Sequence, residues 1–369
     1  MKLENTKKIV IKIGSSLLFD EKTNKLNKEW LISLAEDVNF LKNKNKEVII
    51  VSSGAIAFGA KDLNLEMSEL RLDIHQALAA VGQIQLMSAF KNAFEKHESK
   101  VSQILLTLDD TEKRRRSINA RRTIDNLLKL NIVPIVNEND TIATNEIKYG
   151  DNDRLAARVA QIAGADCLIL LSNINGLYSS DPKNNKELKL IDSVESIDET
   201  IENMAGKSIS ETGKGGMKTK IMAAKTALSA GCHMAITNGT VKNPIQALFN
   251  GRPCTWFTPS KTPLAARKQW IVGTMQAVGS VMIDSGASEA LINGSSLLPA
   301  GILEVHGEFE RGDAIEILSS DKNKIGIGLS SYSSEEGKKI LGHKSNEIGN
   351  ILSYSYREEM IHKDDLVLL

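Results

Sequence analysis

Four short segments of this 369-residue sequence combine glycine with lysine, serine, asparagine or aspartate, and the first follows a strand-like run of Ile and Val. Here Lys12 stands inside the apolar run and is followed by Gly14 and two serines. A lysine in an apolar strand is costly unless an anion meets it, and glycine lets backbone N–H groups approach a phosphate. The alternative is an edge strand that leaves the lysine head in solvent.

The second segment is Ser52-Ser53-Gly54-Ala55, again directly after a strand-like run. Small residues between a strand and a helix leave hydroxyl groups and helix N-terminal amides available to bind an anion. Ser53 and Gly54 are the candidate binding residues. The same composition also suits a tight turn in which only small residues fit.

The third segment, residues 137–153, is rich in carboxylates and amides, and we expect it to be a loop outside the core. Asp140 is suited to an amino group, and Asn152 could hydrogen-bond a carboxylate. In the alternative, this is a solvated acidic loop in which Asp153 caps the following helix.

The fourth segment, residues 212–220, places three glycines and several lysines at the start of a predicted helix. Backbone N–H groups together with lysine cations suit a polyphosphate, whereas the alternative is an ordinary surface loop. The candidate residues are Lys214, Gly215, Gly216, Met217, Lys218, Thr219 and Lys220.

Short apolar strands alternate with helical patterns up to about residue 257, which predicts an α/β domain with a mostly parallel sheet between helices. The predicted strands are 8–13, 48–52, 101–107, 132–136, 167–171 and 234–237, and the predicted helices are 28–42, 72–97, 120–130, 154–163 and 218–230. Such sheets bind ligands at the carboxyl ends of their strands, where the four segments would lie. They indicate phosphoryl transfer to a small zwitterion, and no nucleophile–base pair or metal-ligand cluster competes with this interpretation.

The pattern changes after residue 257. Residues 258–269 are rich in Pro, Ser and Thr and predict a linker, and short, closely spaced strands from residue 270 predict a small β-rich barrel domain. We therefore expect a domain at 1–257, a linker at 258–269 and a second domain at 270–369.

Composition excludes several classes of protein. The net charge is zero and only 4% of the residues are aromatic, which argues against nucleic-acid binding as the main function. Cys167, Cys232 and Cys254 form no metal-binding or disulfide pattern, and no apolar run is long enough for a membrane span. We expect a cytoplasmic protein.

Together the motifs resemble the amino acid kinase family, in particular its glutamate-phosphorylating branch with a C-terminal PUA domain, which is an RNA-binding module in other proteins. The resemblance covers almost the whole chain, and its most specific parts are residues 10–16, 51–57, 133–140, 150–153, 215–220 and 294–302. It implies ATP-dependent phosphorylation of the γ-carboxylate of L-glutamate to γ-glutamyl phosphate. This would be the first step of proline biosynthesis, with feedback inhibition by proline, a requirement for Mg²⁺ and a homodimer or homotetramer.

The resemblance also implies roles for single residues. Lys12 and Lys220 would flank the transferring phosphoryl group, and Asp153 would orient them. Glutamate would be held by Ser53, Gly54, Asp140 and Asn152, and proline would compete there, with Asp110 and Glu146 nearby. ATP would lie against Lys12, Ser172, Asn173 and residues 214–220. Ser172-Asn173 stands where the family usually has Thr-Asp, Lys214 replaces a threonine, and Lys218 replaces a small hydroxyl residue.

Two rival functions remain at this point. One is a related kinase with aspartate or N-acetylglutamate as the acceptor. The other is an RNA-binding protein defined by its C-terminal domain, for which the arginines between residues 114 and 122 are the main basic cluster. The long apolar helix predicted at 72–97 could pack on its own sheet or on a second subunit.

Overall fold

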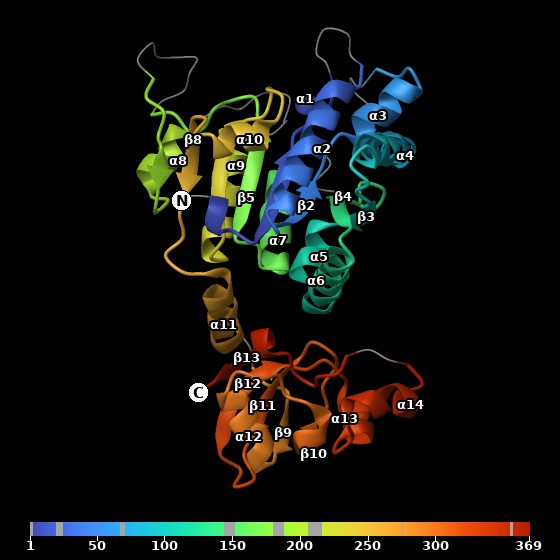
Figure 1. Cartoon of the computed structure of the whole chain (residues 1–369), viewed down its shortest axis with the longest axis vertical. Helices are drawn as coiled ribbons and strands as arrows, with labels where there is room; N and C mark the ends of the chain where they lie inside the picture. Colours follow the sequence, from blue (N-terminus) through green and yellow to red (C-terminus); the bar gives the residue numbers. More distant parts are fainter. Residues whose placement is uncertain are drawn as a thin grey trace. The chain divides into compact units, whose positions relative to one another are not determined.

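The computed structural model describes residues 3–19, 25–66, 71–143, 152–179, 188–205, 216–274, 276–354 and 357–369. The chain divides into two compact units, Met1–Pro263 and Leu264–Leu369 (Figure 1). Residues 263–269, which the sequence analysis assigned to a linker, lie in helix α11 (Pro263–Thr274). Within the described ranges, no helix is both long and apolar enough to span a membrane.

The first unit is built on an eight-stranded sheet with the order β3-β4-β2-β1-β5-β7-β8-β6. All neighbouring strands are parallel except β7 and β8, so the predicted α/β class with a mostly parallel sheet is confirmed. The strands are β1 (Lys8–Ile13), β2 (Glu47–Val51), β3 (Val101–Leu106), β4 (Val133–Glu138), β5 (Cys167–Ser172), β6 (Ser193–Val194), β7 (His233–Asn238) and β8 (Cys254–Phe257).

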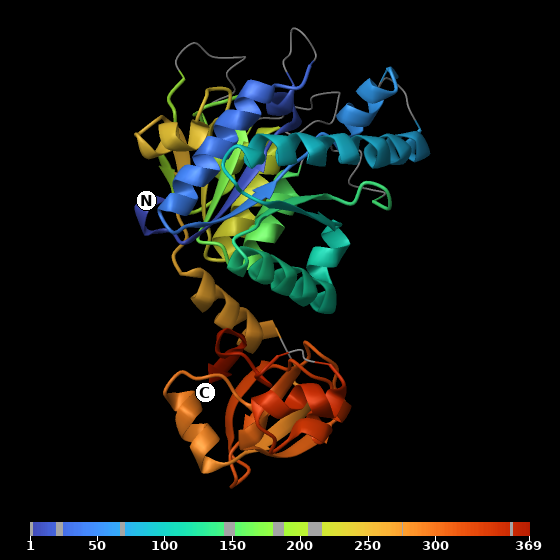
Figure 2. The same cartoon turned by 45° about the vertical axis from the view of Figure 1, so that its right-hand side comes forward.

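Helices cover both faces of this sheet (Figure 2). Alternate residues of β1 divide between two cores: Ile9, Ile11 and Ile13 pack with α2, α4 and α10, whereas Val10 packs with α6, α7 and α9. The helices are α1 (Ser15–Leu18), α2 (Lys28–Asn43), α3 (Ala55–Asp62), α4 (Leu72–Glu95), α5 (Leu108–Glu112), α6 (Arg114–Lys129), α7 (Asp153–Ala163), α8 (Glu199–Met204), α9 (Met217–Ser229) and α10 (Pro244–Phe249). Burial on both faces explains why the strands read as continuous apolar runs.

Helices α3 and α4 pack closely because each has a glycine where they meet. A Cβ atom on Gly59 would lie 1.9 Å from the backbone oxygen of Leu78, and one on Gly82 would lie 1.8 Å from that of Ala55. Any side chain at either position would force the helices apart. This contact fixes α4 against the segment that follows β2.

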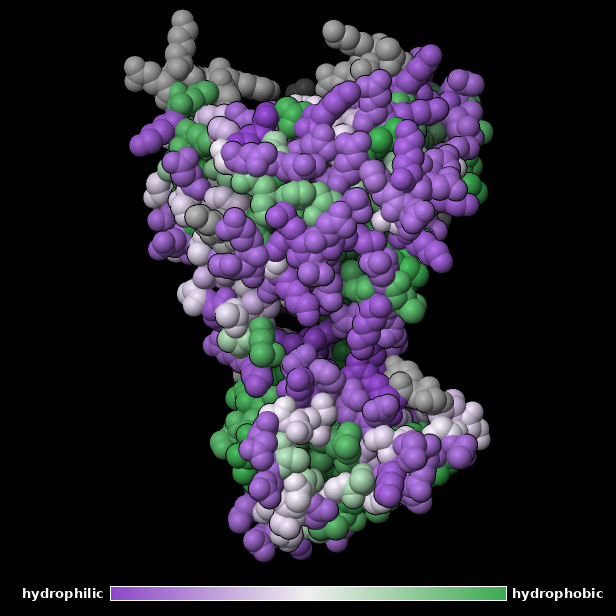
Figure 3. All heavy atoms as spheres, in the orientation of Figure 1, coloured by the Kyte–Doolittle hydropathy of each residue, from purple (hydrophilic) through white to green (hydrophobic). Residues whose placement is uncertain are grey.

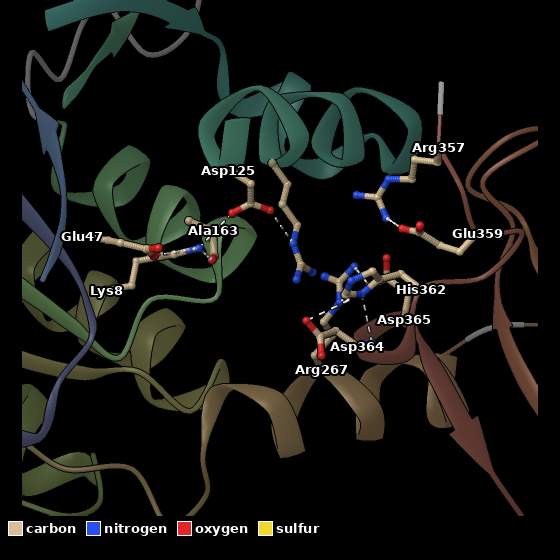
Figure 4. A network of polar contacts seen from close by, with 11 residues as sticks. Lys8, Glu47, Asp125, Ala163, Arg267, Arg357, Glu359, His362, Asp364 and Asp365 are labelled. Carbon is tan, nitrogen blue, oxygen red and sulfur yellow. Dashed lines mark hydrogen bonds and ion pairs between the residues drawn. The ribbon is translucent and has the colours of Figure 1, made fainter. Parts of the chain in front are cut away.

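Lys8 and Lys12 lie at opposite ends of the same strand and differ in their surroundings. At the amino end of β1, Lys8 Nζ donates to Asp125 Oδ1 at 2.9 Å and to the backbone oxygen of Ala163 at 3.0 Å (Figure 4). Lys8 therefore ties α6 and α7 to the sheet. Lys12 lies at the carboxyl end, where the candidate site is found.

The second unit has a five-stranded sheet with the order β10-β9-β11-β12-β13, which confirms the predicted β-rich region. Arg267 of α11 forms an ion pair with Asp365, with Nη2 2.6 Å from Oδ1 (Figure 4). On the visible face of this unit, hydrophobic patches alternate with polar ones (Figure 3). Its elements are α11, β9 (Gly279–Ile283), α12 (Ser285–Ile292), β10 (Ile302–Gly307), β11 (Ala314–Leu318), β12 (Lys324–Leu329), α13 (Ser334–Ile340), α14 (Ile348–Leu352) and β13 (Leu366–Leu368).

Candidate functional site

A buried cluster of three charged side chains lies at the carboxyl end of the large sheet. Lys12 Nζ is 2.6 Å from Asp153 Oδ1, and Lys220 Nζ is 2.9 Å from Asp153 Oδ2. Lys12 is 5% exposed, Lys220 7% and Asp153 0%. The structure thus brings together three residues that are far apart in the sequence.

Asp153 is the centre of this cluster and is held ionised by its two neighbours. Burial by itself raises the pKa of the Asp153 carboxyl, but the charges and hydrogen bonds of Lys12 and Lys220 outweigh it, so the pKa falls well below its usual range. The alternative in which Asp153 caps α7 is wrong: the cap position is Asn152, and Asp153 is the first residue of the helix. Its carboxylate also lies at the favourable end of the α7 dipole.

Lys12 does not lie on an edge strand, since β1 pairs with β2 on one side and with β5 on the other. That alternative is therefore wrong, and the ammonium group is enclosed. Two lysines and one aspartate give the cluster a formal charge of +1 when all three are ionised. Two ammonium groups held in place in this way can meet the oxygens of a phosphoryl group. The arrangement is suited to bind an anion.

The segment after β2 is joined directly to the segment after β1. Ser53 is buried, and its hydroxyl donates to the backbone oxygen of Ile13 at 3.1 Å. Gly54 has φ 99°, in the left-handed region that favours glycine, and precedes α3. Because the Ser53 hydrogen is used inside the protein, its Oγ can serve a ligand only as an acceptor.

The segment after β4 is not wholly outside the core, contrary to our expectation for residues 137–153. Asn137 and Glu138 belong to β4 and are only 1% and 7% exposed. Asn137 is buried because it has amide partners: its Oδ1 accepts from Asn152 Nδ2 at 2.8 Å, and its Nδ2 donates to Gln83 Oε1 at 2.8 Å. Asn152 Nδ2 also donates to the backbone oxygen of Ser52.

These bonds change what Asn152 can offer a ligand. Both of its amide hydrogens are used, one by Ser52 and one by Asn137. A carboxylate bound by Asn152, as expected from the sequence, would need one of those hydrogens. The atom that remains for a ligand is the Asn152 Oδ1 acceptor, which suits an ammonium group.

Asp140 lies just beyond β4 on the wall of a cavity of about 490 Å³. Burial raises the pKa of Asp140 to about 6. The cavity lies between α4, β3 and the end of β4, and its lining includes Gln83, Ile84, Gln103, Glu138 and Asp140. Glu146 lies outside the described residues, and Asp110 forms a capping box with Thr107 and an ion pair with Arg116.

The expected nucleotide segments are described in part. Ser172 ends β5, and its backbone oxygen accepts from the Gly239 N–H at 2.7 Å. Gly216 precedes α9, on which Lys218 is exposed and Lys220 is buried. Thr219 Oγ1 lies between the Gly216 oxygen, at 2.8 Å, and Asp153 Oδ2, at 3.5 Å. Lys214 and Gly215 lie outside the described residues.

A divalent cation at this site would need ligands other than the side chains of the Lys12–Asp153–Lys220 cluster. Within the described parts of the chain, no three His, Cys, Asp or Glu side chains are grouped to hold a metal ion. Both oxygens of Asp153 already face lysines. The donor set therefore fits a cation that arrives coordinated by phosphates and water.

Sequence reasoning missed Gln83 entirely, and it missed the part that Asn137 plays. Gln83 stands in the apolar stretch of α4, accepts a hydrogen bond from Asn137 and lines the cavity beside Asp140. A polar residue within an apolar helical stripe is the signal that could have drawn attention to it. Nothing in the sequence indicates which strand it faces.

Comparisons with known proteins agree with this architecture. Residues 7–238 match the amino acid kinase family, and residues 279–352 match the PUA domain. The chain is 55% identical to a glutamate 5-kinase of Pelagibacter ubique, over 100% of both chains, and 52% identical to one of Agrobacterium fabrum, over 98% of this chain and 92% of the relative. A carbamate kinase from Giardia lamblia bound to AMP-PNP has a similar fold, with a TM-score of 0.50 and 15% identity, covering 70% of this chain and 100% of that one.

Proposed function

Because this chain belongs to the amino acid kinase family and is a kinase, we propose that it transfers the γ-phosphoryl group of ATP to the γ-carboxylate of L-glutamate. The product would be γ-glutamyl phosphate. The observation that carries the proposal is the buried Lys12–Asp153–Lys220 cluster, which holds two ammonium groups on one carboxylate at the carboxyl end of the sheet. The full-length similarity to glutamate 5-kinases supports glutamate as the acceptor.

The chemistry needs positioning and charge neutralisation rather than a general base. A γ-carboxylate oxygen attacks the γ-phosphorus, a new P–O bond forms, and the bond to the β-phosphate oxygen breaks to release ADP. A carboxylate is already ionised at neutral pH, so no proton has to be removed. Lys12 and Lys220 would stabilise the negative charge on the transferring group, while Asp153 holds both ammonium groups in place.

The acceptor groups at the site support binding of an amino acid. Ser53 Oγ, Asn152 Oδ1 and the Asp140 carboxylate can all accept hydrogen bonds from an ammonium group. We assign these residues, together with the backbone at Gly54, to glutamate. Ser172, Asn173 and residues 214–220 would contact ATP.

Mg²⁺ would be carried mainly by the ATP phosphates and water, where it neutralises charge on the phosphates. Lys12 and Lys220 keep their role of meeting the phosphoryl oxygens. Lys218 is exposed and two residues away from Lys220, so we expect it to contribute little to the transfer step.

The finer physiological features follow the same resemblance. The enzyme would act in the cytoplasm as a homodimer or homotetramer and catalyse the first step of proline biosynthesis. Proline keeps the amino and carboxyl groups of glutamate but lacks the γ-carboxylate. It would therefore compete at Asp140 and Asn152 without accepting a phosphoryl group.

The test is trapping of the acyl phosphate with hydroxylamine in the presence of ATP and Mg²⁺. L-Glutamate, L-aspartate and N-acetyl-L-glutamate would be compared, each with and without proline. We expect hydroxamate from L-glutamate alone and less of it when proline is added. Hydroxamate from another acceptor would keep phosphoryl transfer and reject glutamate, whereas no hydroxamate from any of them would reject the proposed reaction.

A further inference from the structure

Three side-chain amides form a directed chain from the site to helix α4. Asn152 Nδ2 donates to Asn137 Oδ1, and Asn137 Nδ2 donates to Gln83 Oε1, each at 2.8 Å. The three residues come from the start of α7, from β4 and from α4. The chain therefore links three elements that flank the carboxyl end of the sheet.

The direction of this chain follows from its first member. The backbone oxygen of Ser52 can only accept, so Asn152 must turn its Nδ2 toward Ser52. The same nitrogen donates to Asn137, so Asn137 must present its Oδ1 to Asn152 and its Nδ2 to Gln83. Gln83 must then present its Oε1. The Ser52 carbonyl thus sets the direction of the chain, and each amide further along holds the preceding one in position.

Helix α4 holds Gln83 at a fixed distance from β4. Gly82, the preceding residue, packs against α3 so closely that a Cβ atom there would lie 1.8 Å from the Ala55 oxygen. The backbone at Gly82, directly before Gln83, is therefore held in place, and the Gln83 side chain meets a buried partner, Asn137, which is 1% exposed. A buried amide that loses its acceptor is destabilised and seeks another orientation.

We infer that Gln83 is a positioning residue for the amino acid substrate: it holds the amide of Asn137, which in turn keeps the carbonyl oxygen of Asn152 directed at the substrate ammonium group. This inference rests on the proposed function, because it takes Asn152 as a contact of the acceptor. Gln83 itself need not touch glutamate. The Nε2 atom of Gln83 is buried and makes no hydrogen bond to any of the described residues. The Gln83 side chain also lines the cavity beside Asp140.

The relay makes a specific prediction for steady-state kinetics. If Gln83 acts through Asn152 on a contact present in both the ground state and the transition state, its loss should raise KM for L-glutamate and leave kcat unchanged. KM for ATP should also stay the same. A purely structural role would instead lower thermal stability or reduce kcat and active fraction together.

The experiment compares Gln83→Leu with Gln103→Leu in the full chain, using hydroxamate formation as the assay. Gln103 lines the same cavity but is exposed and is not part of the amide chain, so it is the matched control. We expect Gln83→Leu to raise KM for L-glutamate about 10-fold, with kcat within about twofold and the melting temperature within a few degrees. Gln103→Leu should be close to wild type.

Unchanged kinetics in a folded Gln83→Leu protein, or an equal KM increase in Gln103→Leu, would overturn the relay. If Gln83→Leu does not fold, Gln83→Met, which is unbranched and of similar length, takes its place with the same expectations. The proposed function has its own control, since wild-type protein that forms no hydroxamate would reject the reaction itself. An active wild type with unchanged variants would reject only the positioning role.

Discussion

The two units of this chain bury charged groups in different ways. In the first unit, two lysines share one aspartate, and the cluster keeps a formal charge of +1. In the second unit, Arg267 and Asp365 form a balanced pair with Nη2 2.6 Å from Oδ1. A one-to-one pair matches one cation with one anion, whereas two ammonium groups held by one carboxylate are suited to meet the oxygens of a phosphoryl group. This difference distinguishes a candidate anion-binding site from an ion pair that stabilises the fold.

The units also differ in overall composition. Residues 264–369 contain 10 lysines and arginines against 15 aspartates and glutamates, whereas the rest of the chain contains 36 against 31. An acidic unit repels the phosphates of a nucleic acid. The second unit therefore offers no electrostatic support for RNA binding as the main function.

A substitution at Asp153 should have the largest effect on stability. Replacing it by Asn removes the shared counter-ion and leaves two buried lysines facing each other, which should cost about 3–5 kcal/mol of unfolding free energy in the first unit. Urea denaturation measures the loss, and ATP should stabilise the variant more than it stabilises the wild type. Asp125→Asn, which affects the partly exposed pair with Lys8, should cost about 1 kcal/mol or less. Equal losses for the two variants would contradict the account.

At Asp140, a single substitution should affect protein stability and glutamate binding in opposite directions. Burial raises the pKa of Asp140 from 3.8 to about 6, so the folded protein is penalised by its ionisation, and this penalty grows as pH rises from about 4 to 6. Asp140→Asn should therefore raise the melting temperature at neutral pH by a few degrees, with the gain vanishing near pH 4. It should also raise KM for L-glutamate at least about 10-fold. A lower melting temperature at neutral pH would contradict the assigned burial.

The smallest effect on activity is expected for a substitution in the second unit. Arg267→Ala leaves Asp365 largely buried without this partner and should cost about 1–3 kcal/mol in the unfolding of that unit. Hydroxamate formation at saturating substrates should not change. The double variant Arg267→Ala/Asp365→Ala should recover part of the lost stability, because it also removes the carboxylate that has lost Arg267. A large fall in kcat would show that this pair is more than structural.

The sequence predicts the fold of the first unit well because its strands are apolar on both faces. Residues 8–13 and 167–171 could be assigned to strands from composition alone, and the structure pairs them side by side. Lys12 stands out in the sequence for the same reason, because it is a charged residue within an otherwise apolar strand. The order of the strands could not be derived, since it depends on contacts between distant segments.

The burial of Asn137 and Glu138 could not be predicted from their types. Both read as loop residues, yet Asn137 enters the core because Asn152 and Gln83 meet its amide. Such a residue has a polar side chain and is buried because other side chains hydrogen-bond to it. The same limit applies to Asp153, which reads as a helix cap until the positions of both lysines are known.

The central claim is that the buried Lys12–Asp153–Lys220 cluster stabilises the transferring phosphoryl group. The most direct measurement is the rate of hydroxamate formation from L-glutamate by Lys220→Ala, with Lys225→Ala, an exposed lysine further along the same helix, as the control. Loss of one preorganised cation should raise the barrier by about 3–4 kcal/mol, which lowers kcat about 100–1000-fold in a folded protein, while the control stays near wild type. Retention of more than about a tenth of the activity by Lys220→Ala would contradict the account.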